Sequence, residues 1–238
     1  ISCASLKCIS LNDIRKKKFK IVIDAVNGAG SDALPALLES LGCEVVELNC
    51  QPSGVFNRGT EPLPENLTDL SNAVIQNNAD AGFAVDPDAD RLAVVDENGK
   101  PLGEEYTLVL AADGYMKNVK KENETFVVNL STSMALEKLS IKNNVKVERS
   151  AVGEINVVKK MNELSSNFGG EGNGGVILRE SHLGRDSLVA ATMVLNRMSQ
   201  SDVSLSKIHA SLPQFDIIKD KVNLEGVDPE VLIHKVES

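Results

Sequence analysis

Strand-like and helix-like segments alternate along almost the whole chain, and this alternation constrains the fold more than any other feature. Short apolar runs at residues 20–24 (KIVID) and 125–130 are each followed by a helix-like segment, at 31–41 and 133–142. Strands that alternate with helices in this way form βαβ units, whose strands are parallel. The sequence therefore predicts an α/β fold, with two consecutive α/β domains and mainly parallel sheets.

The alternation restarts near Pro101, which sets the predicted domain boundaries. The chain has 238 residues, and domains usually have about 100–200. We predict one domain over 1–101, a second over 102–214, and the incomplete start of a third over 215–238. Because the chain begins at Ile1 rather than Met, we expect it to be a piece of a longer protein.

Charge and composition argue against nucleic-acid and membrane partners. Asp and Glu total 34 against 25 Lys and Arg, and aromatic residues make up 3%. A nucleic-acid partner would need a basic face, and only the short run at 15–18 is basic. Apolar runs stay well below the roughly 18 residues that span a bilayer. We therefore predict no nucleic-acid partner and no membrane association.

The four cysteines, Cys3, Cys8, Cys43 and Cys50, form no CxxC pair. A chain of this size does not need disulfides, and this spacing does not suit a zinc site. No secretory signal is recognisable. We expect reduced thiols in a cytoplasmic protein.

An acidic segment, Asp86-Pro87-Asp88-Ala89-Asp90-Arg91, lies between predicted strands over 81–85 and 92–96. In an extended loop, residues two apart point to the same side, so the three aspartates would converge. Converging carboxylates repel one another unless a cation lies among them, and oxygen ligands select a hard ion such as Mg²⁺ or Ca²⁺. The alternative is a solvated acidic turn, since Asp and Pro both favour turns.

The same segment does not fit an EF-hand. Its aspartates and Glu97 match loop positions one, three, five and twelve, but position six needs Gly and holds Arg91. Three carboxylates would leave an octahedral Mg²⁺ open to a phosphate oxygen, and Arg91 is the natural partner for that phosphate. We favour a Mg²⁺ site formed by Asp86, Asp88 and Asp90.

A glycine-rich turn follows the strand over 20–24. Gly28, Gly30 and Ala33 match the dinucleotide pattern G-x-G-x-x-A, and Glu47 lies at a suitable distance for a ribose contact. This gives the alternative function, an NAD(P)-dependent oxidoreductase domain that uses the Gly28/Gly30 turn. Any α/β unit needs a tight strand-to-helix turn, however, and glycine provides one at little cost.

A second glycine-dense segment, residues 169–175, contains Glu171 and Asn173. Glycines let backbone approach a ligand closely, and two polar side chains two residues apart can face the same hydroxyl groups. We predict a ligand-binding loop here. His182 lies nearby and is a weak candidate for catalysis.

Taken together, the segments 86–91 and 170–175 resemble the paired motifs of the α-D-phosphohexomutase superfamily, which includes phosphoglucomutase, phosphomannomutase and phosphoglucosamine mutase. The resemblance covers essentially the whole chain, as domains two and three of a four-domain enzyme. It implies a Mg²⁺ cofactor and a hexose phosphate substrate. In that family a phosphoserine on domain one passes its phosphoryl group to the sugar phosphate, and the resulting bisphosphate returns the other phosphate to the serine.

The resemblance also implies roles for individual residues. Asp86, Asp88 and Asp90 match the Mg²⁺ loop D-G-D-[GA]-D-R, and Arg91 matches its closing arginine, the expected catalytic residue. Glu171 and Asn173 match the loop that holds sugar hydroxyls, with Asn173 where many members carry Ser. Arg185 lies where some members place a cation near the substrate.

The departures from the family pattern define what this chain lacks. The serine motif T-A-S-H-N-P is absent, and so is the phosphate-binding loop of domain four. We therefore expect the chain alone to be inactive and to need domains one and four of the same protein. Its hexose, whether glucose, mannose or glucosamine, is not specified by these residues. A third hypothesis is a non-catalytic module that binds metal or sugar phosphate.

Overall fold

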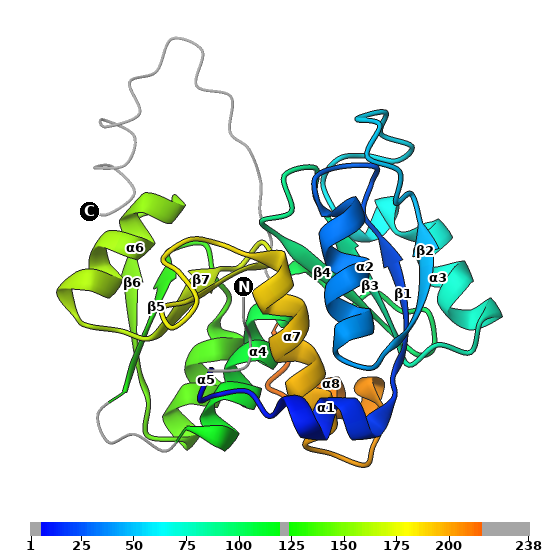
Figure 1. Cartoon of the computed structure of the whole chain (residues 1–238). Helices are drawn as coiled ribbons and strands as arrows, with labels where there is room; N and C mark the ends of the chain where they lie inside the picture. The colour runs from blue at the N-terminus through cyan, green and yellow to red at the C-terminus, as the bar shows by residue number, and fades with distance from the viewer. Residues whose placement is uncertain (1–5, 120–123, 216–238) are drawn as a thin grey trace, which may run out of the picture.

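The computed structural model describes residues 6–119 and 124–215. They form two four-stranded sheets with strand orders β2-β1-β3-β4 and β6-β5-β7-β8 (Figure 1). In each sheet the first three strands are parallel, and the last strand is antiparallel to its neighbour. The predicted α/β class is confirmed, and the two halves repeat one arrangement.

In the first half, helices cover both faces of the sheet. On β1, Ile21 and Ile23 belong to the same core cluster as Leu34 and Leu38 of α2, which contacts the neighbouring strand β2. Val22 packs with Leu70 and Val74 of α3 on the opposite face. A central parallel strand is therefore apolar at consecutive positions rather than at alternate ones. The elements are α1 (Leu11–Lys17), β1 (Lys20–Asp24), α2 (Gly30–Ser40), β2 (Glu44–Leu48), the 3-10 turn η2 (Pro64–Asn66), α3 (Thr68–Gln76), β3 (Ala81–Val85) and β4 (Leu92–Asp96).

The second half follows the same plan. Phe126 and Phe168 of neighbouring strands lie on one face with ring centroids 4.7 Å apart, and Val127 meets Val157 and Met161 of α6 on the other face. The elements are α4 (Glu104–Asn118), β5 (Thr125–Asn129), α5 (Met134–Lys142), β6 (Lys146–Ser150), α6 (Glu154–Glu163), β7 (Phe168–Glu171), β8 (Gly175–Leu178), α7 (Ser187–Ser199) and α8 (Leu205–Ser211).

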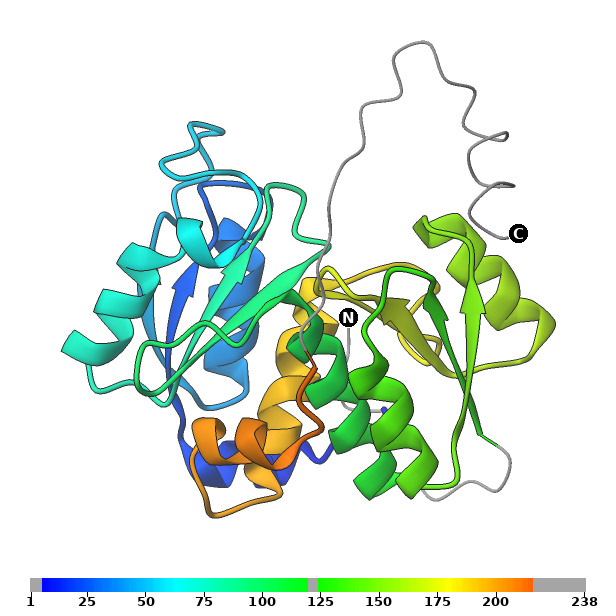
Figure 2. The ribbon, with the colours of Figure 1, turned by 180° about the vertical axis from the view of Figure 1, so that it is seen from behind.

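Helices α4 and α7 pack against each other between the two sheets (Figures 1 and 2). Nearly every residue of both helices is buried, since α4 also contacts β4 and β8, and α7 also contacts α1, α2 and β8. Within this contact Arg197 of α7 forms a buried ion pair with Asp113 of α4. The two halves are therefore joined by a shared core.

Helix α1 precedes β1, and Lys18 ends it in a left-handed conformation with φ 50°. One element differs from the sequence prediction. Part of the predicted glycine loop forms strand β7 instead. A Cβ at Gly169 would lie 2.6 Å from the Val127 carbonyl oxygen. This glycine is therefore needed for close strand packing.

Some predictions fall outside the described residues. The incomplete third domain expected over 215–238 lies almost wholly in the undescribed range 216–238. The described cysteines are free thiols: Cys8, Cys43 and Cys50. Among the helices of residues 6–119 and 124–215, none is long and apolar enough to cross a membrane.

Candidate functional site

The predicted site residues gather where the two sheets present their carboxyl edges. Asp86 directly follows β3 in the first half, and Glu171 ends β7 in the second. Two backbone hydrogen bonds join these regions: Leu92 N–H donates to the Gly174 carbonyl at 3.1 Å, and Ser187 N–H to the Ala89 carbonyl at 3.2 Å. The acidic loop and the glycine-rich segment are therefore neighbours in the fold.

The acidic loop brings three carboxylates together. Oxygen atoms from Asp86, Asp88 and Asp90 all lie within 4.8 Å of one another, which confirms the predicted convergence. The predicted extended loop is wrong, because the chain curls in a turn with Ala89 at φ 57°. Inside the turn, Asp86 Oδ1 accepts hydrogen bonds from the backbone N–H groups of Asp90 and Arg91, both at 3.1 Å.

The electrostatics of this loop differ sharply between two of its aspartates. Burial alone would raise the pKa of Asp86, but hydrogen bonds from the backbone and side chain of Arg91 outweigh burial and lower it. At Asp90, burial and the charge of Asp86 raise the pKa to about 7. Asp86 is thus held ionised. Asp90 lies beside that negative charge and therefore binds a proton more tightly than an ordinary aspartate does.

The donor set fits a hard divalent cation. All three side chains offer carboxylate oxygens, the ligands that Mg²⁺ prefers. The buried Oδ1 of Asp90 accepts no hydrogen bond from the residues that the structure describes. A buried carboxylate oxygen without a donor is costly, and a cation among the three groups would satisfy it.

Arg91 contacts carboxylates on both sides of the loop. Its guanidinium pairs with Asp86 and with Glu61, whose Oε1 lies 3.1 Å from Nη2. Glu61 was not identified from the sequence, because it lies in a long loop without a recognisable motif. A phosphate bound by Arg91 would have to compete with Glu61, which is half exposed.

Arg58 anchors the loop that carries Glu61. Its almost buried side chain donates to Asp24 Oδ2 at 2.9 Å and to the Val85 carbonyl at 2.7 Å. These partners are the last residues of β1 and β3. The arginine therefore fixes the loop against the same sheet edge that holds the aspartates.

The glycine turn after β1 supports the acidic loop. Gly28 N–H donates to the Ala25 carbonyl at 2.8 Å, and Ala29 N–H donates to the Pro87 carbonyl at 2.8 Å. A pyrophosphate would need such N–H groups to be free. The turn's glycines are explained by packing, and the dinucleotide alternative is not supported.

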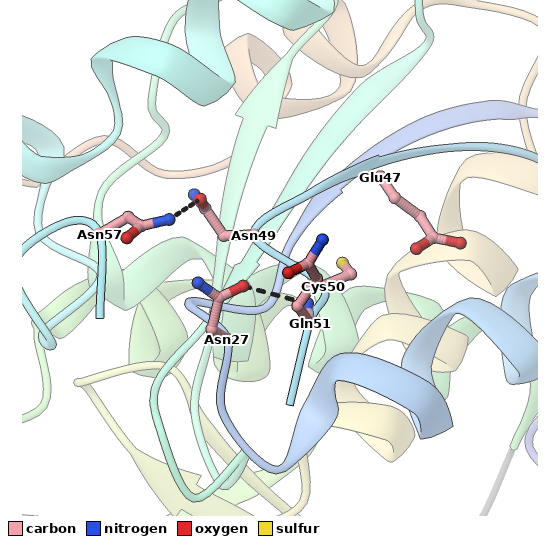
Figure 3. A pocket seen from close by; sticks show the side chains of 6 residues that line it. All are labelled: Asn27, Glu47, Asn49, Cys50, Gln51 and Asn57. Atoms are coloured by element: carbon pink, nitrogen blue, oxygen red, sulfur yellow. Dashed lines mark hydrogen bonds between the residues drawn. The ribbon is translucent and has the colours of Figure 1, made fainter. Parts of the chain in front are cut away.

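A polar pocket of about 320 Å³ lies beside this turn (Figure 3). Asn27 is part of its wall and accepts a hydrogen bond from the backbone N–H of Gln51 at 3.0 Å, while Asn57 donates to Asn49 at 3.0 Å. Amides and one carboxylate dominate the lining. The lining residues are Asn27, Glu47, Asn49, Cys50, Gln51 and Asn57.

Glu171 is held firmly at the end of β7. It is 3% exposed, and its Oε1 accepts hydrogen bonds from Asn129 Nδ2 at 2.7 Å and Gly153 N–H at 3.0 Å. Asn173 is partly buried, and its Oδ1 accepts the Gly175 N–H at 3.2 Å. Hydrogen bonds therefore fix both residues, and Asn173 also shapes the turn between β7 and β8.

Arg185 links the two loops. Its Nη1 lies 2.8 Å from Glu171 Oε2, its Nε lies 3.2 Å from Glu154 Oε2, and its Nη2 pairs with Asp90. Glu154 was missed from the sequence, where nothing marks the first residue of α6 as a partner of Arg185. Close by, His182 Nε2 donates a hydrogen bond at 2.9 Å to the carboxylate of Asp186, the N-cap of α7.

The described cysteines are poor nucleophiles. Burial raises the pKa of Cys8 and of Cys43 to about 12, and that of Cys50 to about 11. Their thiols therefore stay protonated at neutral pH.

Comparison with known families identifies both halves. The family model "Phosphoglucomutase/phosphomannomutase, alpha/beta/alpha domain II" matches residues 3–99, and the model of domain III matches residues 103–215. The chain belongs to the phosphoglucomutase/phosphomannomutase family. Its acidic loop thus lies in domain II, and Glu171 and Arg185 lie in domain III.

Relatives extend over most of this chain. It is 35% identical over 229 residues to a phosphoglucomutase/phosphomannomutase of Thermococcus kodakarensis, covering 96% of this chain and 50% of that protein. It is 33% identical over 215 residues to a probable phosphoglucosamine mutase of Methanopyrus kandleri, covering 90% and 47%. The chain therefore spans about half the length of the curated relatives it matches.

Solved structures show the same fold. A putative phosphomannomutase from Thermus thermophilus superposes with a TM-score of 0.77 at 22% identity, covering 85% of this chain and 47% of that one. A phosphoglucomutase/phosphomannomutase family protein from Burkholderia thailandensis gives 0.75 at 25% identity, covering 86% and 46%. The mutase domain pair is therefore recognisable in both sequence and structure.

Proposed function

We propose that this chain is the central part of a Mg²⁺-dependent phosphohexomutase, which moves phosphate between the 1- and 6-positions of a hexose phosphate through a phosphoserine and a bisphosphate intermediate. The observation that carries the proposal is the convergence of Asp86, Asp88 and Asp90 beside Glu171 of the other domain. The names of the relatives also support it. A structural neighbour, the N-acetylphosphoglucosamine mutase of Aspergillus fumigatus, was solved with GlcNAc-6P and magnesium.

The three aspartates are the proposed metal ligands. Mg²⁺ held there would offset negative charge on a phosphoryl group during transfer. The chain's own contribution is orientation: the turn fixes Asp86 through two backbone hydrogen bonds, and Arg91 balances its charge. We assign Arg91 to a phosphate oxygen of the substrate, since a guanidinium binds phosphate through two parallel N–H donors.

Glu171 and Asn173 are the proposed sugar contacts. An ionised carboxylate has about four acceptor positions, and Glu171 uses three of them on Asn129, Gly153 and Arg185. The remaining position can accept a hydrogen bond from a sugar hydroxyl. Because Glu171 is already fixed by these partners, binding the hydroxyl would cost little ordering entropy.

The reaction needs groups that this sequence does not contain. The motif T-A-S-H-N-P is absent, so this chain lacks the motif's seryl oxygen, which would accept the phosphoryl group in line. We therefore propose that domains one and four of the same protein complete the enzyme, in the cytoplasm. A coupled assay should detect no interconversion of hexose 1- and 6-phosphates by the purified chain, and substantial turnover would contradict this part of the proposal.

Ligand binding tests the proposal without requiring turnover. We expect millimolar glucose 6-phosphate, mannose 6-phosphate or glucosamine 6-phosphate with Mg²⁺ to raise the melting temperature, because a ligand that binds the folded state stabilises it. Glu171→Gln should lose this shift, and Glu163→Gln at the end of α6 should keep it. A shift with NAD⁺ and none with any of the three sugar phosphates would overturn the assignment.

A further inference from the structure

Arg185 forms an ion pair across the boundary between the two domains. It belongs to the segment between β8 and α7, whereas its partner Asp90 belongs to the acidic loop of the first half. Both side chains are 19% exposed. The same guanidinium also reaches Glu171 and Glu154. One side chain therefore contacts both the proposed metal ligands and the proposed sugar-binding residues.

The backbone near Arg185 is fixed, while its guanidinium has alternative partners. Ser187 binds the Ala89 carbonyl through both its N–H, at 3.2 Å, and its hydroxyl, at 2.6 Å. The stem of Arg185 lies over Gly175, where an added Cβ would lie 2.3 Å from the arginine Cδ. The head group can thus change partner without any movement of the loop.

The charges at this boundary do not balance. The guanidinium groups of Arg91 and Arg185 contact Asp86, Asp90, Glu61, Glu154 and Glu171, and Asp88 completes the acidic cluster. Two cationic groups thus face six carboxylates. Arg185 bonds Asp90 at Oδ2, whereas Asp90 Oδ1 has an ion pair with Arg91 Nε at 3.5 Å and accepts no hydrogen bond within the described part of the chain.

We propose that Arg185 is a displaceable counter-cation of the metal site, and that it couples metal binding in the first domain to ligand binding at Glu171 in the second. This inference rests on the proposed metal site. A divalent ion carries twice the charge of a guanidinium and takes the Asp90 oxygens, and Arg185 then pairs with Glu171 and Glu154 alone. A phosphorylated ligand that draws Arg185 away from Asp90 raises the affinity of the site for Mg²⁺. By thermodynamic linkage, Mg²⁺ raises the affinity for that ligand by the same factor.

Magnesium titration of charge variants tests the competition. Calorimetry with Mg²⁺ would compare the wild-type chain, Arg185→Gln, Arg185→Lys and the control Arg15→Gln. The control removes the same charge from exposed α1, where Arg15 donates to the Ser40 carbonyl at 3.2 Å. We expect Arg185→Gln to bind Mg²⁺ about two- to fivefold more tightly than the control, the range expected for a partly exposed ion pair. Arg185→Lys should lie between Arg185→Gln and wild type.

Side-chain NMR provides a readout that a merely structural role would not move. On adding Mg²⁺, the Nε–Hε signal of Arg185 should shift, and that of Arg179, which donates to the Ser166 carbonyl at 2.6 Å, should not. If Mg²⁺ binds but Arg185→Gln matches Arg15→Gln and the Arg185 signal stays in place, the coupling is wrong and the metal site stands. If no variant binds Mg²⁺, the metal site itself is refuted, and the coupling with it.

Discussion

Gly28 lies so close to Pro87 that a Cβ added at Gly28 would be 2.5 Å from the Pro87 carbonyl oxygen. The first residue follows β1 and the second follows β3, and the two strands are parallel neighbours. Two loops that leave the same edge of a sheet are thus packed backbone against backbone. The glycine of the apparent dinucleotide pattern serves this contact, and through it supports the turn that carries Asp86, Asp88 and Asp90.

Substituting Gly28 should therefore disturb the acidic loop. We expect Gly28→Ala to destabilise the chain by about 1–3 kcal/mol, the usual cost of overpacking, and to weaken Mg²⁺ binding because the Pro87 carbonyl must move. Urea unfolding and calorimetry would measure both effects. Gly54→Ala is the control, since a Cβ there meets no atom within 4 Å, and its φ of 69° adds only local backbone strain. Equal Mg²⁺ affinities in the two variants would refute the link between the turn and the site.

Removing one carboxylate should test the metal site most directly. We expect the wild-type chain to bind Mg²⁺ measurably but loosely, and Asp88→Ala to bind it at least about tenfold more weakly. Removing a metal ligand should weaken binding no less than removing a group that only orients a ligand. Asp88 is exposed, so the substitution should leave the folded structure intact. Asp202→Ala removes an exposed carboxylate paired with Lys17 and should bind like wild type. Identical isotherms for the two variants would show that the acidic loop does not bind Mg²⁺.

The parts of the fold that were predictable are those encoded by local patterns. The strands over Ala81–Val85 and Leu92–Asp96 have the predicted bounds, because continuous apolar runs between turn residues allow few alternatives. Strand β7 was not predicted, since Gly169 and Gly170 have low strand propensity. Their value comes from packing against β5 and β8, which only the tertiary structure shows.

The candidate site divides in the same way. The alternating aspartates were found because their spacing alone suggests convergence, although a turn at Ala89 rather than an extended loop brings them together. Glu61 and Glu154 were not found, because each gains its role only by meeting an arginine distant in sequence. Single charged residues in loops or at helix starts are common, and nothing local distinguishes these two.

The buried ion pair between α4 and α7 should stabilise the contact between the two domains. We expect Arg197→Met to destabilise the chain by about 3–5 kcal/mol, because it leaves the carboxylate of Asp113 buried without its partner. The double variant Arg197→Met/Asp113→Leu should recover most of the loss, since both charges are then gone. Thermal unfolding of the two variants and wild type would measure this. A double variant as unstable as Arg197→Met would mean that the lost packing, rather than the unpaired charge, causes the effect.

The raised pKa of Asp90 predicts how stability depends on pH when no metal is bound. An aspartate in the unfolded chain has a pKa of about 3.9, whereas burial and the charge of Asp86 raise the pKa of Asp90 to about 7 in the folded chain. The folded state thus binds the Asp90 proton more tightly than the unfolded state does. Protonation of Asp90 therefore stabilises the fold fully below the unfolded pKa, and this stabilisation is lost as the pH rises towards 7.

Asp90→Asn keeps a neutral group at every pH. In EDTA, we expect the variant to match wild type near pH 4 and to be more stable by roughly 1–3 kcal/mol at pH 8. Urea unfolding across this range would measure the difference, with Asp69→Asn on α3 as a surface control. A difference between Asp90→Asn and wild type that stays constant with pH would contradict the raised pKa.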